Sequence, residues 1–255
     1  MTTRRKVTWA VVAVAVAAFA IWAQQRISGL SEDTQATNPI FRWEYLLKRE
    51  RTPSELWEAT RQHLELTVVP VLIGTVLSAG LAVLILRFNW LRAVIFTFAG
   101  VLYTIPSLAL FAILVTYNTN WTAAVIALTS YTLLIITRNI VAGIDAVPQA
   151  ALDAADGLGM SRPQRLRKVE IPLAMPVILT GIRVATVTVV GLVGISVVIQ
   201  LGGLATYIFD GYNRSYSTVL VLGTVAIILL AVVLDLAIRG VEWLVTPWAH
   251  RVAAR

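Results

Sequence analysis

The sequence predicts an all-α protein, a polytopic transmembrane helical bundle of about six spans. Hydrophobic residues make up 58% of the 255 residues, charged residues only 14%, and the mean hydropathy is +0.77, which no ordinary soluble domain reaches. The apolar residues gather in runs and do not alternate with polar ones as in half-buried strands. Helices are expected, because a backbone exposed to lipid must satisfy its own hydrogen bonds. The runs cover residues 7–23, 64–86, 93–115, 122–137, 184–200 and 218–238.

The first apolar run follows three cations and resembles a signal peptide in charge and position. A signal peptide has a shorter apolar region and an A-x-A-like cleavage site, whereas Trp22, Gln24 and Arg26 stand at the end of this one. A retained helix is therefore favoured, and cleavage stays open. The organisation that follows is an N-terminal helix with a partly helical external segment over residues 1–62, a core over 63–240 and a cytoplasmic tail over 241–255.

The distribution of Lys and Arg predicts which connectors face the cytoplasm, because cytoplasmic connectors retain cations. With the N-terminus inside, that side receives 14 Lys and Arg against five Asp and Glu, whereas the opposite side is neutral with seven of each. Both termini and the connector 138–172 are thus expected inside, and residues 30–60 outside. The net charge of +7 forms no dense basic stripe, so nucleic acid is not expected as a partner.

The connector 138–172 is too long to be a mere turn between two spans. Pro148 can begin a short Ala-rich helix over 149–158, which Gly157 or Gly159 would close. Ser161 with Gln164 offers a capping box for a second helix, which Pro172 is expected to interrupt. The first helix should present a small apolar surface fit for a partner's groove, formed by Ala150, Ala151, Ala154, Ala155 and Leu158.

The same connector carries a family signature. The pattern EAA-x3-G-x9-I-x-L-P of ABC importer permeases is matched with its spacing fully kept and three conservative replacements, at Asp153, Ala154, Ala155, Gly159, Val169, Ile171 and Pro172. The chain therefore resembles these permeases, the membrane components of binding-protein-dependent transport with the type I importer fold. In that family this segment is the coupling loop, whose short helix docks into a cleft of the ATPase subunit.

Further stretches are similar to the glycine betaine/carnitine/choline branch of these permeases. They are residues 104–110, 126–131, 138–139, 157–160, 181–186 and 202–204. Two departures concern Ile135, where the branch usually has Pro, and residues 200–205, where it has a Gly-Ala-Gly-Gly-Leu-Gly run. Without that Pro the fourth span keeps a backbone hydrogen bond and should lack a kink there.

The resemblance implies a multi-pass subunit of the bacterial inner membrane and a set of partners. These are two ABC ATPase subunits, an extracytoplasmic solute-binding protein, a second permease that is identical or homologous, and the lipid bilayer. ATP and Mg would be bound by the partner ATPase, since this chain has no G-x-x-x-x-G-K-[ST] phosphate loop and is expected to need no cofactor. The solute implied is a small compatible solute such as glycine betaine, choline or carnitine.

A pathway for a permanently charged quaternary ammonium favours aromatic faces and weak dipoles over tight ion pairs. Aromatic and hydroxyl residues within the expected spans, together with one proline, are candidates, although each could equally serve interhelical packing. The candidates are Tyr103, Thr104, Pro106, Ser107, Tyr131, Thr186 and Thr188.

The residues that other functional classes require are missing from this sequence. The chain contains no Cys, His63 and His250 stand alone and no H-E-x-x-H occurs, so neither a metal site nor catalytic residues are expected. An ion-coupled secondary transporter or channel, or a permease for another small solute such as an amino acid, remains an alternative. Glu65 and Asp235, the two acids within apolar runs, are expected to anchor at an interface or to pair with a cation, and Arg183 to lie at the entrance of the fifth span.

Overall fold

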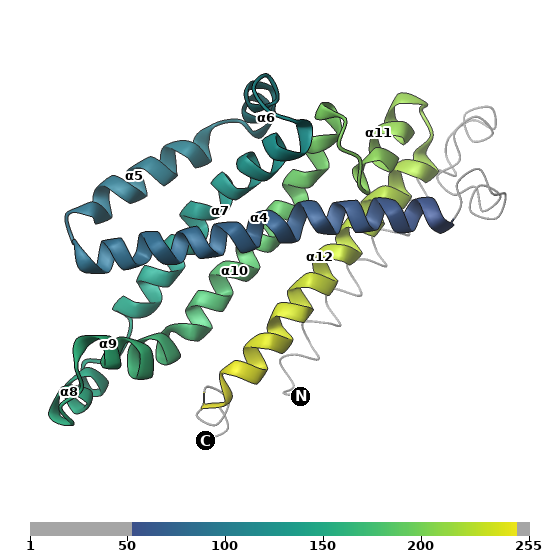
Figure 1. Cartoon of the computed structure of the whole chain (residues 1–255). Coiled ribbons are helices and arrows are strands. Elements are labelled where there is room, and N and C mark those ends of the chain that lie inside the picture. The colour runs from purple at the N-terminus through teal and green to yellow at the C-terminus, as the bar shows by residue number, and fades with distance from the viewer. Residues whose placement is uncertain (1–52, 249–255) are drawn as a thin grey trace, which may run out of the picture. The chain divides into compact units, whose positions relative to one another are not determined.

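The structure is a computed structural model that describes residues 53–248, and every regular element in that range is a helix (Figure 1). The expected all-α class is therefore confirmed. The first apolar run and the polar segment before residue 53 lie outside the described residues. Residues 207–222 belong to one compact unit and the remainder of the described chain to another, and the two are treated in turn.

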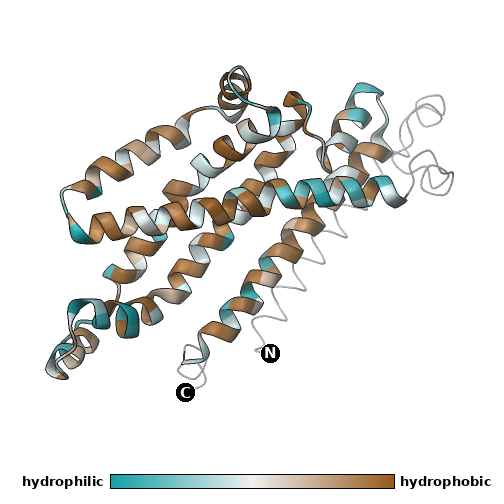
Figure 2. Cartoon of the chain, in the orientation of Figure 1, coloured by the Kyte–Doolittle hydropathy of each residue, from teal (hydrophilic) through white to brown (hydrophobic). Residues whose placement is uncertain are grey.

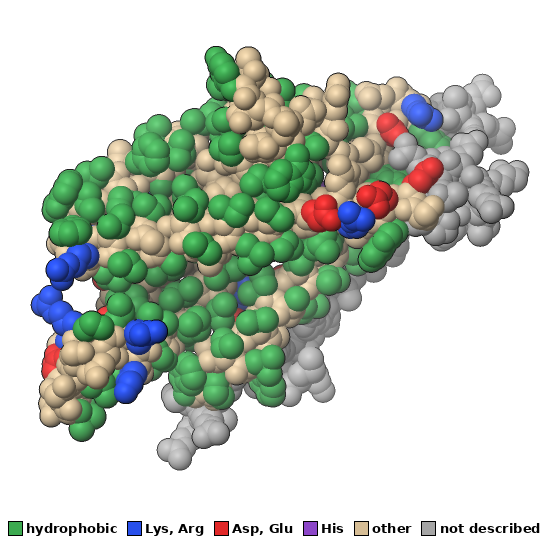
Figure 3. All heavy atoms as spheres, viewed as in Figure 1, with side chains coloured by type: hydrophobic (Ala, Val, Ile, Leu, Met, Phe, Trp, Pro, Cys, Tyr) green, Lys and Arg blue, Asp and Glu red, His purple; other side chains and the backbone are tan. Residues whose placement is uncertain are grey.

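Four described helices are long and apolar enough to cross a membrane, and a bent pair makes a fifth candidate. Five of the six expected spans are thus present in the described part of the chain. Figure 2 shows hydrophobic residues along most of these helices, with hydrophilic ones at the start of α4 and around the short helix α9. Figure 3 shows most of the visible Lys and Arg side chains near the end of the bundle that carries α8 and α9. The four are α4 (Pro53–Arg87), α7 (Asn120–Asp145), α10 (Ile171–Val193) with its flanking turns, and α12 (Ser217–Val245).

The third span, expected as one run over residues 93–115, is bent in the structure. The chain turns by 89° between α5 (Leu91–Thr104) and α6 (Ser107–Val115). Pro106 explains the break, because its ring disfavours helical backbone at Ile105, which has ψ 127°, and it cannot donate a backbone hydrogen bond. The carbonyl of Ile105 is satisfied instead by the hydroxyl of Tyr131 on α7, at 2.5 Å.

Helix α7 lies at the centre of the larger unit and packs against both α4 and α10. A Cβ on Gly74 of α4 would stand 1.8 Å from the hydroxyl of Thr132, and one on Gly181 of α10 would stand 2.3 Å from the Cβ of Asn139. Glycines thus let these helices approach closely, as small residues do in membrane bundles. A buried apolar cluster joins α4, α6, α7, α10 and the turn after α10, and includes Leu66, Phe111, Leu128 and Val193.

The connector predicted over residues 138–172 is mostly helical. Its predicted ends were wrong, because the helices on both sides extend into it. Helix α7 continues through Ile135 to Asp145 without a kink, and a helical stretch runs from Arg162 to Ile199. Pro172 does not end this stretch, contrary to expectation: it is the second residue of α10 and lies inside the continuous run of helix. Between α9 and α10 the stretch passes through a π-helical turn, η1 (Leu166–Glu170).

After α10 the chain tightens into a 3-10 turn, η2 (Gly194–Ile199), and closes back on α4. The side-chain oxygen of Gln62 accepts a hydrogen bond from the backbone N–H of Gly203 at 2.8 Å. The ring of His63, fully buried, lies with its Nε2 3.1 Å from the carbonyl of Val190. No role was expected for His63 from the sequence, and here it joins the third turn of α4 to the end of α10.

The smaller unit holds most of α11 (Ala205–Asn213) and the start of α12. Its two helices meet in a tight turn, where the N–H of Tyr216 donates to the carbonyl of Gly211 at 2.7 Å. A Cβ on Gly211 would stand 2.4 Å from the backbone nitrogen of Leu220, so only glycine permits this approach.

Candidate functional site

The signature residues of the connector form a short helical hairpin. Helix α8 (Gln149–Gly157) is followed by a turn, by the single-turn helix α9 (Arg162–Arg165) and by η1, and residues 148–170 are called the α8–η1 hairpin below. Pro148 precedes α8 with extended backbone, as expected from the sequence. The helix ends at a left-handed Gly159, φ 71°, whose N–H donates to the carbonyl of Asp156. Glycine adopts this conformation without a Cβ penalty, which confirms it as the closing residue.

The apolar surface expected on α8 is present, but Ala155 is not part of it. Ala150 and Ala154 are exposed, Ala151 is partly exposed and the Leu158 side chain is 77% exposed. Ala155 is only 3% exposed, so its methyl group packs inside the hairpin and cannot touch a partner. The prediction that Ala155 presents its methyl group outward was therefore wrong, because it assumed that neighbouring alanines share one face.

The second part of the hairpin begins as the sequence predicted. Ser161 and Gln164 form a capping box, and the Ser161 N–H donates to the Gln164 side chain at 2.9 Å. On α8 the side chain of Asp153 accepts a hydrogen bond from Gln149 at 2.9 Å and stays exposed. The acid of the signature is thus held on the surface of α8 beside Ala150 and Ala154.

An ion cluster inside the hairpin was not predicted. One guanidinium nitrogen of Arg165, Nη1, lies 2.7 and 2.9 Å from the two carboxylate oxygens of Asp156, and Nε lies 2.8 Å from Glu170. The side chains are 25%, 54% and 13% exposed for Arg165, Asp156 and Glu170. The partners stand nine and five residues from Arg165, spacings that helical i, i+4 rules do not detect.

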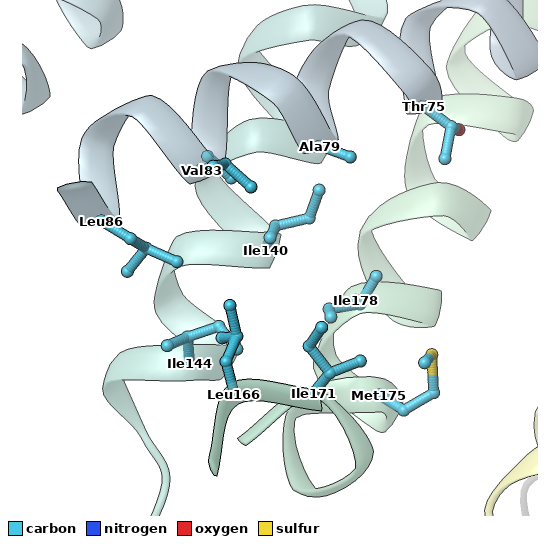
Figure 4. A pocket seen from close by; sticks show the side chains of 11 residues that line it. Thr75, Ala79, Val83, Leu86, Ile140, Ile144, Leu166, Ile171, Met175 and Ile178 are labelled. Carbon is cyan, nitrogen blue, oxygen red and sulfur yellow. The ribbon is translucent and has the colours of Figure 1, made fainter. Parts of the chain in front are cut away.

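An apolar groove separates the hairpin's last turn from α4. It has a volume of about 240 Å³, and Figure 4 shows side chains from α4, α7, η1 and α10 around it. Its one hydroxyl group, on Thr75, donates to the carbonyl of Val71, so no polar atom is left for a hydrated ligand. Leu166 of the hairpin and Ile171 of α10 line one side of the groove, and Val83 and Leu86 of α4 line the other (Figure 4).

The pathway candidates separate into two places. Five lie at the corner between α5 and α6 or beside it, where the rings of Tyr103 and Tyr131 meet edge to face at 5.9 Å. Tyr103, Thr104 and Pro106 are exposed and Ser107 is partly exposed. Tyr131 is 4% exposed and its hydroxyl is engaged with Ile105, so it supports the corner from behind instead of facing a pathway.

The other two candidates, Thr186 and Thr188, lie on α10. Two residues along a helix correspond to about 200°, so they cannot share a face. Thr186 is buried and Thr188 partly exposed, and each hydroxyl donates to the carbonyl four residues earlier, at 2.8 Å. Thr186 is thus packed inside the chain, and only Thr188 is placed where a solute could reach it.

The charges within the spans are paired. Arg183 lies in the middle of α10, not at its entrance as expected, and its Nε and Nη2 each lie 2.8 Å from one oxygen of Asp235 on α12. Arg239 approaches the other oxygen of Asp235 at 2.9 Å, and Glu242 lies 3.8 Å from Arg183. Glu65 pairs with Arg61 at 2.9 Å on the same helix. Pairing with a cation was one of the two roles expected for Glu65 and Asp235. Acids that are paired in this way suit a structural anchor better than a proton relay.

Comparisons with known proteins identify the family. Residues 66–245 match the family described as binding-protein-dependent transport system inner membrane component. This chain belongs to that family. It is 39% identical over 194 residues to the osmoprotectant import permease protein OsmW of Salmonella typhimurium, covering 74% of this chain and 90% of that protein. It is 33% identical to the glycine betaine/carnitine/choline transport system permease protein OpuCB of Bacillus subtilis, covering 76% and 89%.

Solved structures agree on the fold. The methionine ABC transporter MetNI in an inward-facing conformation has a chain that superposes with a TM-score of 0.66 at 21% identity, covering 77% of this chain and all of that one. An amino acid ABC transporter gives 0.60 at 22%, covering 75% and 92%. The permease of a type I importer is thus the fold of this chain.

The family decides the functional class. The chain is an inner-membrane permease component of an ABC importer, a transport subunit and not an enzyme. A transporter of this kind works with a solute-binding protein and an ATPase. The ion-coupled transporter or channel considered from the sequence is therefore set aside.

Proposed function

We propose that this permease forms, with a second identical or homologous permease, the pathway of an ATP-driven importer for a small compatible solute. Glycine betaine, choline and carnitine are the solutes that best fit. The observation that carries this choice is that similar permeases at 32–39% identity are named for osmoprotectants, glycine betaine, carnitine or choline. The amino acid transporters share only the fold, at 21–22% identity, and do not favour a second solute.

The corner between α5 and α6 is the part of the chain best suited to line the pathway. Broken backbone at membrane depth is tolerated only where it is buried in protein or lines a water-filled cavity. Tyr103, Thr104, Pro106 and Ser107 are at least partly exposed there, and Thr188 is so on α10. A tyrosine face attracts a quaternary ammonium without a counter-charge, which is the recognition such a solute needs. Tyr131 and Thr186 would hold this lining in place from behind.

The α8–η1 hairpin is proposed as the ATPase-coupling element. Its docking surface would comprise Ala150, Ala151, Asp153, Ala154 and Leu158, with Ala155, Gly159 and Pro172 shaping the hairpin behind it. Small side chains and one exposed leucine suit insertion into a groove, because they need little space. Two ATPase subunits, which bind ATP and Mg, and one external binding protein would complete the importer.

Uptake by the reconstituted importer tests the solute. Proteoliposomes would contain the permease with its cognate ATPase, ATP inside and the binding protein outside, and uptake of labelled glycine betaine, choline and carnitine would be measured. ATP-dependent uptake of at least one is expected, and an amino acid such as methionine serves as the competing solute. Uptake of methionine with none of the three quaternary ammonium compounds would reject the solute assignment and leave the permease class.

Docking is tested separately with exposed and buried alanines. Ala154→Arg should reduce co-purification of the ATPase, since a long charged side chain would enter the proposed interface. The control is Ala146→Arg, which changes an exposed residue that precedes α8 and should retain the ATPase. Equal retention by both variants would show that α8 does not dock.

Orientation is tested by thiol labelling, because the chain contains no Cys and each introduced one is unique. Leu158→Cys should react with an impermeant reagent only from the cytoplasmic side and Tyr117→Cys only from outside, as the proposed internal hairpin and internal termini require. Both side chains are highly exposed, at 77% and 83%, so labelling is not limited by burial. The reverse pattern would overturn the orientation.

A further inference from the structure

Helix α8 is linked to the residue before α10 through one side chain, that of Arg165. Asp156 lies in the last turn of α8, and Glu170 is the residue directly before α10 begins at Ile171. The guanidinium of Arg165 contacts both carboxylates at 2.7–2.9 Å. Arg165 therefore connects the end of the short helix to the residue that directly precedes α10.

Little else in the described structure fixes α8 to the bundle. Ala155 is its one buried residue, and the turn after it is held by backbone hydrogen bonds within the hairpin itself. The apolar groove lies between α4 on one side and Leu166 of the hairpin and Ile171 of α10 on the other (Figure 4). Where this groove lies, open space separates α4 from Leu166.

We propose that Arg165 is a positioning residue that makes α8 and the start of α10 move as one body. A displacement applied to α8 would then reach the pathway through α10 instead of being absorbed by the π-helical turn η1. This inference rests on the proposed function, because α8 is displaced only if an ATPase docks on it. Arg165 itself needs to touch neither the ATPase nor the solute.

The chemistry of the cluster explains why arginine is used. A guanidinium presents Nε and Nη1 in a fixed plane, so it holds Glu170 and Asp156 in one geometry. An ammonium is a single point charge on a flexible chain and cannot fix both directions at once. Arg162 offers a matched control, because it lies on the same short helix, is exposed and has no ion-pair partner among the described residues.

Hydrogen exchange tests the mechanical link without transport. In the full-length permease, Arg165→Gln should raise the exchange rate of the α8 amides about tenfold, whereas Arg162→Gln should leave it unchanged. Arg165→Lys should fall between the two. Unchanged exchange in Arg165→Gln would overturn the proposal, since α8 would then be held by something else.

Coupling is measured on the reconstituted importer as solute transported per ATP hydrolysed. Arg165→Gln should lower this ratio about tenfold while the ATPase still co-purifies and its KM for ATP stays unchanged, and Arg162→Gln should behave as wild type. A wild-type ratio in Arg165→Gln would overturn the proposal. So would loss of the bound ATPase, because Arg165 would then serve docking and not transmission.

Two further measurements distinguish failure of the proposal for Arg165 from failure of the proposed function. If Arg165→Gln fails to insert, Asp156→Asn removes one charge of the cluster, keeps an acceptor oxygen and should lower the ratio less. A wild-type importer that binds no ATPase or moves no solute would reject the proposed function itself. A working wild type with an unaffected Asp156→Asn and Arg165→Lys would reject only the role of Arg165.

Discussion

Helices α7 and α12 both have the length and composition of a span, yet they are held in opposite ways. Buried residues make up 56% of the apolar window of α7 and 11% of that of α12. Glycines bring α4 and α10 into direct contact with α7, whereas α12 meets α10 through charged side chains, Arg183 with Asp235 and Glu242. Within the described part of the chain, close packing fixes α7, and ion pairs are what join α12 to α10.

The largest expected effect comes from filling the close approach at α7. Gly181→Ala would place a Cβ 2.3 Å from that of Asn139, which a side-chain rotation cannot relieve because a Cβ is fixed to the backbone. Destabilisation of about 3 kcal/mol is expected, at the upper end of overpacking. The control on the same helix is Gly191→Ala, where nothing lies within 4 Å. Unfolding in mixed micelles measures both, and equal stabilities would disprove the close approach.

Breaking the polar contact of α12 should cost less. Asp235→Asn would remove the nearer of the two carboxylates beside the Arg183 guanidinium, which is 19% exposed, and about 2 kcal/mol of stability is expected to be lost. A double-mutant cycle with Arg183→Gln isolates the pair, and its coupling energy should be clearly favourable. Additive effects of the two substitutions would mean that the ion pair does not hold α12.

A smaller effect is expected at the crossing of α4 with α7. Gly74→Ala would bring a Cβ to 1.8 Å from the hydroxyl oxygen of Thr132, but that oxygen ends a side chain and can rotate away. A loss of about 1 kcal/mol is expected after this adjustment. At Gly80, on the same helix with nothing within 4 Å, alanine should instead stabilise by about 0.5–1 kcal/mol through helix propensity. The same sign for both variants in thermal unfolding would contradict the crossing.

The smallest effect concerns the N-terminus of α7, where packing ends. The hydroxyl of Thr119 accepts a hydrogen bond from the N–H of Thr122 at 3.3 Å and caps the helix. Thr119→Ala should therefore cost about 0.5–1 kcal/mol, and Thr119→Ser should cost almost nothing because it keeps the acceptor. Equal losses for both would indicate that the methyl group, and not the cap, matters.

The features of the fold that could be predicted from the sequence are those that depend on a local pattern of residues. Apolar run length identified the described spans, and Pro148, Gly159 and the pair of Ser161 with Gln164 located the hairpin, because each acts on its own turn of backbone. The ends of α7 and α10 were missed, since polar residues continue a helix once it has left the apolar region. The bend at Pro106 was also missed, because hydropathy does not distinguish a straight run from a broken one.

Contacts between distant elements could not be predicted in this way. Arg165 was counted among the cations of the connector, yet its contacts with Asp156 and Glu170 depend on the π-helical turn that follows it. Arg183 and Asp235 are 52 residues apart, and only the packing of two helices brings them together. Ala155 was placed on the wrong side because exposure depends on where the next helix folds back.

The bend between α5 and α6 also constrains the order in which the protein is made. With 14 and nine residues, the two arms measure about 21 and 14 Å, so neither alone crosses an apolar layer of about 30 Å. The hydroxyl that satisfies the carbonyl of Ile105 belongs to Tyr131, which is synthesised 26 residues later. The corner therefore acquires this hydrogen bond only after α7 has entered the membrane, and maturation of the third span waits for the fourth.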